Sequence, residues 1–425
     1  MRALTLLAAT AALLLSSCSD EPAPDYEAGI TEEDHATGAE QHEKLLAQFG
    51  GEYKGARQDY LRAVGERVAR AAGLDDQCTF TLVNSDVANA FAVPGCFIYV
   101  TRGLMGIVNS EDELASVLGH EVGHIVAQHG QRQQQRSLWS TLGVLAISLA
   151  GSEQLTRLAA GAAQFFGLRY SREQEYESDE LGIRYLQKAG YDPYAAADML
   201  AALGRQQSFV AASGGEDEAR SMPEWASSHP LTDKRIDRTR GLAEATGIAD
   251  DAVPEKEAPY LAAVDGLLYG DDPQQGFVMG RRFAHPVMRI GFEAPQGFTL
   301  TNSPQAIMIS GPDGVRGEFG GGGMGSGGIE AYARRLVEQA LGDTASEVGT
   351  AEQTMVNGLP AIILPVRIQA EQGIVPIAIV AYDAGRAQAY HFIIAAPEGD
   401  SQAGAIRQLF ASFRLLHGEG REQLT

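Results

Sequence analysis

The sequence predicts an α+β protein of two domains. The first would be mainly helical with a small β-sheet, and the second would hold an antiparallel sheet covered by helices. At 425 residues the chain is long enough for two cores. Apolar residues recur at helical spacing in several segments of the first 250 positions. From about Val287 short strand-like runs take over, with two helical stretches between them.

The first half of the chain alternates helical patterns with two short strands. Helical spacing covers residues 55–72, 110–130, 171–189, 193–210 and 232–246, and the strand-like runs are Thr79–Val83 and Phe97–Thr101. The apolar segments 137–150 and 158–168 fall short of the roughly 20 apolar residues that a membrane span needs. We expect them to form a helical hairpin packed over the domain, and we expect the Gly-, Ser- and acid-rich stretch 211–224 to be a mobile loop.

The second half predicts the antiparallel sheet. Strand-like runs lie at 288–292, 306–309, 361–369, 375–382 and 389–395, and helical stretches at 329–341 and 403–413. The pattern resembles the PsbP/Mog-type sandwich. Gly323–Gly328 matches G-x-G-x-x-G, but a dinucleotide site also needs a parallel βαβ unit. Because the surrounding pattern is antiparallel, we interpret these glycines as a flexible loop and expect no dinucleotide.

The most informative motif lies in the second helical range. His120-Glu121-Val122-Gly123-His124 matches H-E-x-x-H. Residues four apart share one helix face, so both imidazoles can reach one metal ion while Glu121 stands beside its open coordination position. Ser110 as N-cap, Glu113 as its capping-box partner and Gly130 as a stop support the helix. The motif therefore predicts a zinc-bound water with a general base.

A catalytic zinc site usually takes a third protein ligand, and an acidic helix offers the candidates. Glu173, Glu175 and Glu177 all lie near its start, and their spacing alone does not choose among them. Helical spacing places Asp179 on the face of Glu175, where it can accept the second ring N–H of a ligand histidine. A solvated acidic helix is the alternative interpretation.

Together these motifs resemble a known peptidase family. His120-Glu-x-x-His124, then Glu175-x-x-x-Asp179, with Asn89–Val100 upstream, is similar to the zinc metallopeptidases that include HtpX, BepA (YfgC) and the Ste-type CAAX proteases, and most of all to the BepA-like periplasmic lipoproteins. The resemblance covers residues 40–245. It implies a gluzincin-like fold, Glu175 as the third ligand and one Zn²⁺ per chain. The family typically has a second glycine where this chain has Cys96.

The resemblance also implies further site residues. The family carries Ser-His-Pro followed by a basic residue and Ile, here Ser228-His229-Pro230 and Arg235-Ile236. His229 would approach the open metal position or bind the tetrahedral intermediate as a catalytic residue, and a surface turn histidine is the alternative. In the upstream segment the expected substrate-binding residues are Asn89, Ala90, Phe91 and Ala92.

The positive charge of a bound zinc ion predicts the mechanism of peptide hydrolysis. Zinc lowers the pKa of bound water to about 7. Glu121 would accept the proton as hydroxide attacks a peptide carbonyl, and would then pass it to the leaving amine. The β-forming run Phe97–Thr101 would offer an exposed edge to an extended peptide, although core packing explains the same residues. Such an edge favours unfolded or locally extended polypeptides.

The N-terminus predicts export and lipid attachment. An apolar run follows Arg2, as in a signal peptide over 1–17, and Leu15-Ser16-Ser17-Cys18 resembles a bacterial lipobox. Lipidation of Cys18 would anchor the protein to a membrane, which in an organism with two membranes implies the outer one, facing the periplasm. The predicted organisation is then a lipidated tether (18–39), a zinc metallopeptidase domain (40–246), a linker (247–285) and a C-terminal α+β domain (286–425).

The remaining cysteines bear on the redox compartment, and the net charge limits the class of partner. Cys78 and Cys96 each precede a predicted strand, and an exported protein meets an oxidising compartment. If those strands are parallel neighbours, the two sulfurs meet in a disulfide. The net charge is −22, from 33 basic and 55 acidic residues, and this argues against nucleic acid as a partner.

The predicted function is that of a zinc metalloendopeptidase in envelope protein quality control. Its partners would be polypeptides, among them outer-membrane proteins or their assembly machinery. The alternative is a periplasmic chaperone or scaffold for outer-membrane protein assembly, whose zinc site is occluded by His229 or by the 211–224 loop. A specialised processing peptidase is a third hypothesis.

Overall fold

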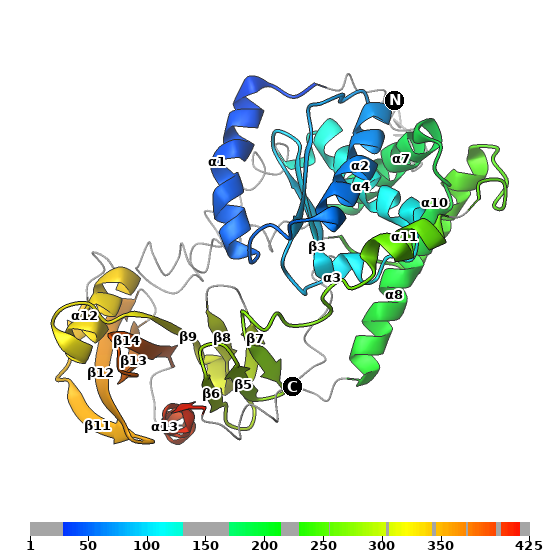
Figure 1. Ribbon diagram of the computed structural model, residues 1–425. Helices are drawn as coiled ribbons and strands as arrows, with labels where there is room; N and C mark the ends of the chain where they lie inside the picture. Colours follow the sequence, from blue (N-terminus) through cyan, green and yellow to red (C-terminus); the bar gives the residue numbers. More distant parts are fainter. Residues whose placement is uncertain are drawn as a thin grey trace, which may run out of the picture.

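A computed structural model describes most of the chain (Figure 1). The described residues are 29–130, 170–213, 229–254, 256–302, 306–341, 346–370, 373–396 and 401–416. The predicted signal peptide, Cys18, the apolar hairpin and most of the predicted 211–224 loop lie outside these ranges. Within them, no helix is both long and apolar enough to cross a membrane.

The N-terminal body is built on a three-stranded sheet. Its strands are β1 (Thr79–Val83), β2 (Ala90–Val93) and β3 (Phe97–Thr101), in the order β1-β3-β2. β1 runs parallel to β3, whereas β2 runs antiparallel to it. β3 is therefore the central strand, and the prediction that Phe97–Thr101 offers an exposed edge is wrong. The edge strands are β1 and β2, and the upstream motif Asn89–Val93 encodes β2.

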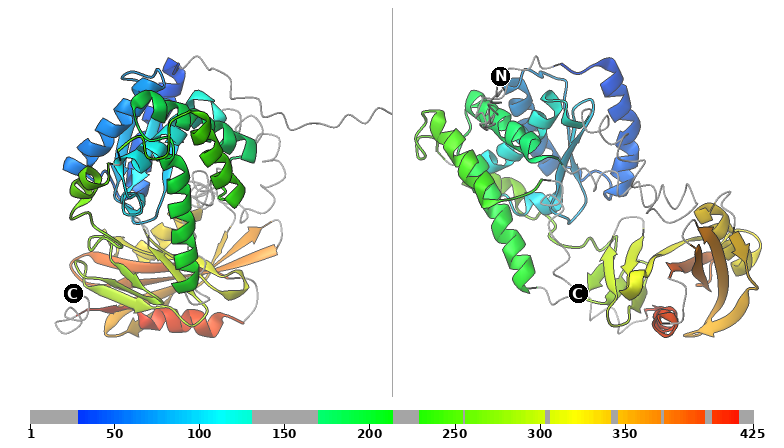
Figure 2. Two further views of the ribbon diagram at one scale, coloured as in Figure 1. Left: turned by 90° about the vertical axis from the view of Figure 1, so that its right-hand side faces the viewer. Right: turned by 180° about the vertical axis from the view of Figure 1, so that it is seen from behind.

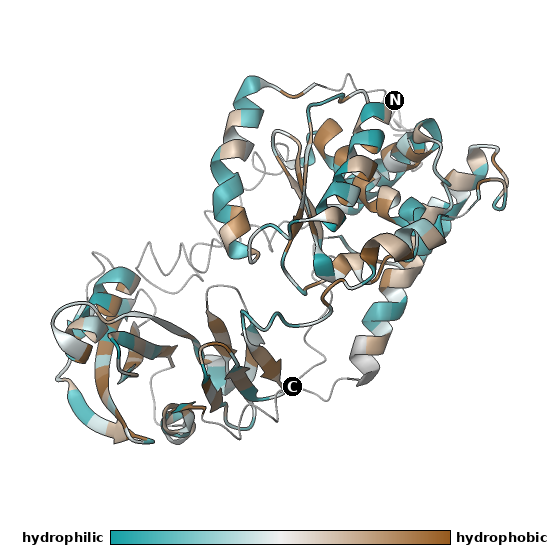
Figure 3. Cartoon of the chain, in the orientation of Figure 1, coloured by the Kyte–Doolittle hydropathy of each residue, from teal (hydrophilic) through white to brown (hydrophobic). Residues whose placement is uncertain are grey.

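Helices cover both faces of this sheet, as Figures 1 and 2 show. α1 (Glu32–Gln48) lies on one side, and α2 (Ala56–Ala71) and α4 (Glu111–Val126) lie on the other. Ile98 and Val100 of β3 point into the core with α2 and α4, whereas Phe97 and Tyr99 pack with residues of α1. Hydrophobic residues accordingly gather on the strands and on the inner helix faces (Figure 3).

α1 was not expected from the sequence. The predicted tether 18–39 overlaps it, because the chain is helical from Glu32 onward. Thr31 caps this helix in a capping box with Asp34, which fixes its start. Gly38 allows the helix to lie against the β2–β3 turn, since a Cβ there would overlap the carbonyl oxygen of Pro94.

The remaining helices of this body surround α4. They are α3 (Arg102–Met105), α7 (Arg172–Ala189), α8 (Ala195–Ser213), α10 (Asp233–Ala245) and α11 (Glu257–Val264). Two glycines of α4 bring α7 close: a Cβ on Gly119 would lie 3.3 Å from the carbonyl oxygen of Gly182, and one on Gly123 would lie 3.0 Å from that of Ser178. The glycine inside the H-E-x-x-H pentad therefore permits the close approach of the two helices.

The C-terminal body contains two antiparallel sheets. One has the order β15-β6-β5-β4; the other has the order β10-β12-β13-β14-β9-β8-β7, with β11 also paired to β12. The strands are β4 (Phe277–Met279), β5 (Arg282–His285), β6 (Ile290–Glu293), β7 (Thr299–Asn302), β8 (Ile307–Ser310), β9 (Arg316–Gly323), β10 (Ser346–Val348), β11 (Glu352–Val356), β12 (Leu359–Ala370), β13 (Gly373–Asp383), β14 (Gln388–Ala395) and β15 (Arg414–Leu415). α12 (Gly328–Leu341) packs on β12 and β13, and α13 (Ala403–Ser412) packs on β6. The predicted fold class, a mainly helical domain with a small sheet followed by an antiparallel α+β domain, is confirmed.

The predicted linker contains α11, β4 and β5. Within the predicted linker 247–285, α11 packs against α2 and α4 through the buried Tyr260. The end of the same range holds β4 and β5, which pair antiparallel with each other, and β5 also pairs with β6. This range therefore contributes elements to both bodies.

Two glycines of β9 permit close packing against β14. β9 pairs antiparallel with both β8 and β14. A Cβ on Gly320 would lie 3.1 Å from the ring of His391, and one on Gly321 would lie 2.6 Å from the ring of Tyr390. The G-x-G-x-x-G match begins at the last residue of this strand and ends at the first residue of α12.

Candidate metal centre

The H-E-x-x-H motif lies on α4, as its spacing predicts. Ser110 caps the helix and accepts a hydrogen bond from the backbone N–H of Glu113. His120, Glu121 and His124 are all buried, and the Nε2 atoms of the two histidines lie 3.0 Å apart. Both rings thus present a nitrogen to the same point, which is the arrangement that a shared metal ion requires.

α7 and the segment before α10 complete the cluster. Glu175 of α7 is buried, and its Oε1 lies 2.9 Å from Nδ1 of His229, which itself lies 3.2 Å from Nε2 of His120. One ligand atom from each of His120, His124, Glu175 and His229 falls within 4.8 Å of the others. The acidic helix therefore places Glu175, rather than Glu173 or Glu177, beside the histidines.

The protonation states in this cluster suit a metal ligand set. Burial lowers the pKa of His124 well below its usual value, so its ring is neutral. Burial also opposes ionisation of Glu175, but His229 and Arg235 outweigh it and hold the pKa of that carboxyl well below its usual value. A neutral imidazole and an ionised carboxylate are the forms that bind a divalent cation.

Glu121 is the ionisable residue of the pentad that lies outside the ligand set. It is fully buried, and neither of its carboxylate oxygens has a hydrogen-bond partner among the described residues. Nε2 of His229 lies 3.6 Å from its Oε1. Burial raises the pKa of Glu121, and a carboxylate with a raised pKa is a better proton acceptor near neutral pH. A buried carboxylate without hydrogen bonds beside three ligand atoms fits a metal site with a general base.

Asp179 holds the first histidine in place. Its Oδ1 lies 2.9 Å from Nδ1 of His120, which directs Nε2 of that ring into the cluster. Arg235 of α10 donates to both Asp179 oxygens and forms an ion pair with Glu175. Arg235 was not predicted as a site residue. Its only sequence signal was the basic residue that follows Ser-His-Pro in the family pattern.

A second group missed by the sequence reasoning surrounds His124. α4 ends at Val126, four residues before the predicted stop, and Gln128 has a left-handed backbone with φ of 54°. The turn returns His129 to the cluster, where its Nδ1 lies 2.8 Å from Nδ1 of His124. Nε2 of His129 lies 2.9 Å from Oε2 of Glu177.

Tyr170 forms a further wall of the site. Its ring stacks on His124 with centroids 3.8 Å apart and an angle of 25° between the planes. Burial raises the pKa of the Tyr170 hydroxyl, which keeps it protonated as a hydrogen-bond donor. No sequence pattern had indicated this residue.

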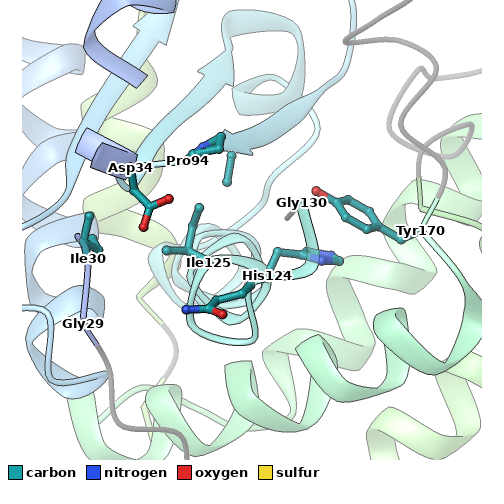
Figure 4. Close-up of a pocket in the computed structure, with 11 residues that line it drawn as sticks. Gly29, Ile30, Asp34, Pro94, His124, Ile125, Gly130 and Tyr170 are labelled. Carbon is teal, nitrogen blue, oxygen red and sulfur yellow. The ribbon is translucent and has the colours of Figure 1, made fainter. Parts of the chain in front are cut away.

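A cavity opens beside His124 (Figure 4). Its walls come from the start of α1, the β2–β3 turn, the end of α4 and Tyr170, and include Ile30, Asp34, Ala92, Pro94 and Ile125. Of the four predicted substrate-binding residues, only Ala92 lines this cavity. Ala90 is buried in the core, and Phe91 stacks on Tyr99.

The backbone groups of β2, unlike most of its side chains, lie where a peptide could pair with them. Asn89 accepts a hydrogen bond from the backbone N–H of Thr101 and donates its own N–H to the Thr101 side chain. Because hydrogen-bonded pairs alternate in an antiparallel ladder, the N–H and C=O groups of Ala90 and Ala92 point away from β3. Within the described residues β2 is thus an edge strand whose outward backbone groups lie beside the cavity.

Cys78 and Cys96 form a disulfide with Cα atoms 4.6 Å apart. The parallel register of β1 and β3 pairs Thr79 with Phe97, so the two cysteines that precede these residues are neighbours. Cys96 has a left-handed φ of 58°, directly after Gly95 with φ of 83°. The backbone at position 96 explains the glycine that the family typically has there.

These features define the class of site as a metallopeptidase centre: two histidines one helical turn apart, a carboxylate from a second helix and a buried glutamate beside them. Residues 55–243 match the sequence model of Peptidase family M48. This part of the chain is similar to that peptidase family.

Curated relatives match a comparable share of the chain. A beta-barrel assembly-enhancing protease of Yersinia pestis is 34% identical over 196 residues, which are 43% of this chain and 38% of that protein. The mitochondrial metalloendopeptidase OMA1 of Arabidopsis thaliana is 34% identical over 188 residues, 44% of this chain and 36% of that protein. The chain thus spans less than half the length of these relatives.

A solved structure shares a weak likeness with part of the chain. The cyanobacterial PsbP of Synechocystis sp. PCC 6803 covers 34% of this chain and 98% of its own, at 15% identity and a TM-score of 0.27. At this level the PsbP/Mog-type resemblance of the C-terminal body stays a prediction.

Proposed function

We propose that the protein is a zinc-dependent endopeptidase that hydrolyses peptide bonds of unfolded or misassembled envelope proteins. The observation that carries this proposal is the buried cluster of His120, His124 and Glu175 with Glu121 beside it, whose carboxylate has no hydrogen-bond partner among the described residues. M48 peptidases are metallopeptidases, which supports the assignment. The ligand set and the role of each residue are part of the proposal.

His120, His124 and Glu175 would hold one Zn²⁺. The ion would supply a Lewis acid for the scissile carbonyl and would lower the pKa of a water molecule to about 7. Glu121, at its raised pKa, would accept a proton from the attacking water and deliver it to the leaving amine. Asp179 would keep the His120 ring in the tautomer that presents Nε2 to the metal.

The substrate would bind as an added strand. The outward N–H and C=O groups of Ala90 and Ala92 offer a peptide two backbone positions beside the cavity. Such pairing requires an extended backbone, which a folded protein rarely exposes. We therefore propose unfolded or locally extended segments as the substrate class.

The proposed cellular setting is the bacterial envelope. The signal peptide and Cys18 support an exported, lipid-anchored protein at the outer membrane, facing the periplasm. Bacterial relatives carry the name beta-barrel assembly-enhancing protease, which supports outer-membrane proteins or their assembly machinery as partners. We propose 40–246 as the peptidase domain and 286–425 as a domain that recruits partners.

One observation favours a second candidate function. Nδ1 of His229 lies 2.9 Å from Glu175 and 3.2 Å from His120, so His229 occupies the place of a fourth ligand. A closed four-ligand site is typical of structural zinc. The second candidate is therefore a periplasmic chaperone or scaffold for outer-membrane protein assembly, in which His229 occludes the metal.

Cleavage of an unfolded protein tests the first proposal. The purified full chain should degrade casein, a zinc chelator should stop the reaction, and added Zn²⁺ should restore it. Glu121→Gln should keep zinc bound and lower kcat by about 100-fold or more, because it removes the general base. Full activity in Glu121→Gln, or no effect of the chelator, would reject the mechanism.

His229→Ala separates the two candidates. If His229 acts as a catalytic residue, the variant loses activity while zinc stays bound. If His229 occludes the site, a wild-type protein without activity becomes active in the variant. Zinc content, measured on both proteins by elemental analysis, shows that the comparison is made with loaded sites.

A further inference from the structure

We propose that His129 and Glu177 form a hydrogen-bond relay that positions His124 as a metal ligand. The inference rests on the proposed zinc site and assigns a role to two residues outside the predicted ligand set. His129 is completely buried, whereas the side chain of Glu177 is 19% exposed. The relay runs from Glu177 through His129 to His124, with two contacts below 3 Å.

The end of α4 creates this arrangement. In an uninterrupted helix, residues five apart lie about 140° apart around the axis, so His129 would point away from His124. The left-handed Gln128 breaks the helix instead and returns the chain toward α7. Nδ1 of His129 then meets His124 and, at 3.3 Å, the hydroxyl of Ser178, whereas Nε2 of His129 meets Glu177.

The hydrogen bonds fix one tautomer for each ring. Glu177 as a carboxylate can only accept, so Nε2 of His129 donates to it and Nδ1 of His129 is the acceptor. Nδ1 of His124 must then donate to His129, which leaves the Nε2 lone pair of His124 free to bind metal. Nε2 is the atom that faces His120 at 3.0 Å.

The two ligand histidines are therefore oriented in different ways. Asp179 contacts His120 directly, at 2.9 Å. For His124 the carboxylate of Glu177 stands one imidazole further away, and His129 transmits its effect. Groups behind a ligand histidine typically change metal affinity 10- to 100-fold when they are removed, which sets the expected size of the effect.

Zinc affinity of the purified full chain tests the relay. His129→Phe keeps a ring of similar size but removes both nitrogens, and we expect it to weaken zinc binding by about 10- to 100-fold. Glu177→Ala should weaken binding in the same direction, and Glu177→Gln should recover part of the loss because its amide oxygen still accepts from His129. Glu173→Ala is the matched control, an exposed carboxylate one turn earlier on the same helix.

Two further measurements exclude a merely structural role. The thermal unfolding midpoint of the zinc-free proteins shows whether a variant is destabilised before metal binds. The visible absorption of the Co²⁺-loaded proteins reports the ligand field directly, and we expect His129→Phe to shift it while Glu173→Ala leaves it unchanged.

The outcomes are distinguishable. If wild type binds no zinc, the proposed function itself fails. If wild type binds zinc and His129→Phe and Glu177→Ala bind it equally tightly with unchanged Co²⁺ spectra, only the relay is rejected. Equal losses in Glu173→Ala and Glu177→Ala would also reject it, because the effect would then come from the charge of the helix.

Discussion

The Arg235 guanidinium donates two hydrogen bonds of 2.7 Å to the Asp179 carboxylate, and both side chains are buried. Burial alone would raise the pKa of Asp179, but Arg235 and His120 outweigh it and hold that pKa at about 2. α7 and α10 are thus joined by an ion pair behind the metal cluster, and its loss has a measurable cost.

Removal of Arg235 should destabilise the peptidase domain. Arg235→Met leaves the buried Asp179 and Glu175 without their cation, which should lower the free energy of unfolding by about 3–5 kcal/mol. Arg235→Lys should restore only part of it, since an ammonium lacks the planar fork that binds both carboxylate oxygens. Urea unfolding measures the change. Arg240→Met on the same helix is the control, because Arg240 is 45% exposed in its ion pairs and should contribute less than about 1 kcal/mol.

A proline in β2 should block substrate pairing. Ala92→Pro removes an N–H that points away from β3, so the β2–β3 ladder keeps its bonds while a bound peptide loses one. We expect kcat/KM for casein to fall about 10-fold, mostly through KM. Ala92→Ser keeps the N–H and should behave as wild type. A normal KM in Ala92→Pro, with unchanged thermal stability, would show that the peptide binds elsewhere.

Loss of the disulfide should destabilise the same domain. The bridge spans 18 positions of sequence, for which loop-closure entropy predicts about 3 kcal/mol. Far-UV circular dichroism follows the loss of the helices of this domain in urea. Cys78→Ser/Cys96→Ser should lose this free energy and no longer respond to a reducing agent. Equal stability with and without reductant in the wild type would contradict the expectation.

Acid should weaken the C-terminal domain through His391. Burial lowers the pKa of His391 to about 4, and its Nδ1 lies 2.9 Å from the hydroxyl of Tyr332. Between pH 6.5 and 4 the unfolded chain binds a proton that the native ring does not, so stability present above about pH 6.5 is lost as the pH falls.

This contribution can be isolated by calorimetry. From pH 7 to pH 5 the His391 term should amount to about 2 kcal/mol. His391→Gln removes the titrating ring, so its C-terminal transition should lose less stability over that interval than the wild type. Identical pH dependence in the two proteins would assign the acid sensitivity to other groups.

The features predicted from the sequence are those that depend on local pattern. The helix around His120 follows from the Ser110 cap and from apolar spacing within a few turns, although the Glu113 carboxylate accepts from Asn109 and does not close the predicted capping box. The disulfide could also be predicted, because Cys78 and Cys96 each precede a strand and their sulfurs meet if the two strands are parallel neighbours. The start of α1 escaped because it is polar and acidic, and its buried residues are only Gly38 and Leu45.

Other features depend on how distant segments meet. Spacing on α7 left three glutamates open, and it is the close approach of Gly123 to Ser178 that selects Glu175. The order of the strands in the sheet decides which strands lie at its edges, and the pattern of strand-forming residues does not reveal that order. His129 was hidden because the predicted helix end lay four residues too late, so the turn at Gln128 was not expected.

The cavity beside His124 has Gly29 in its wall, eleven residues along the chain from Cys18. A fully extended chain of that length reaches at most about 40 Å. If Cys18 carries the proposed lipid, the cavity wall at Gly29 stays within this distance of the bilayer surface. Cleavage would then be limited to polypeptides close to the membrane surface, and proteins deeper in the compartment would lie beyond its reach.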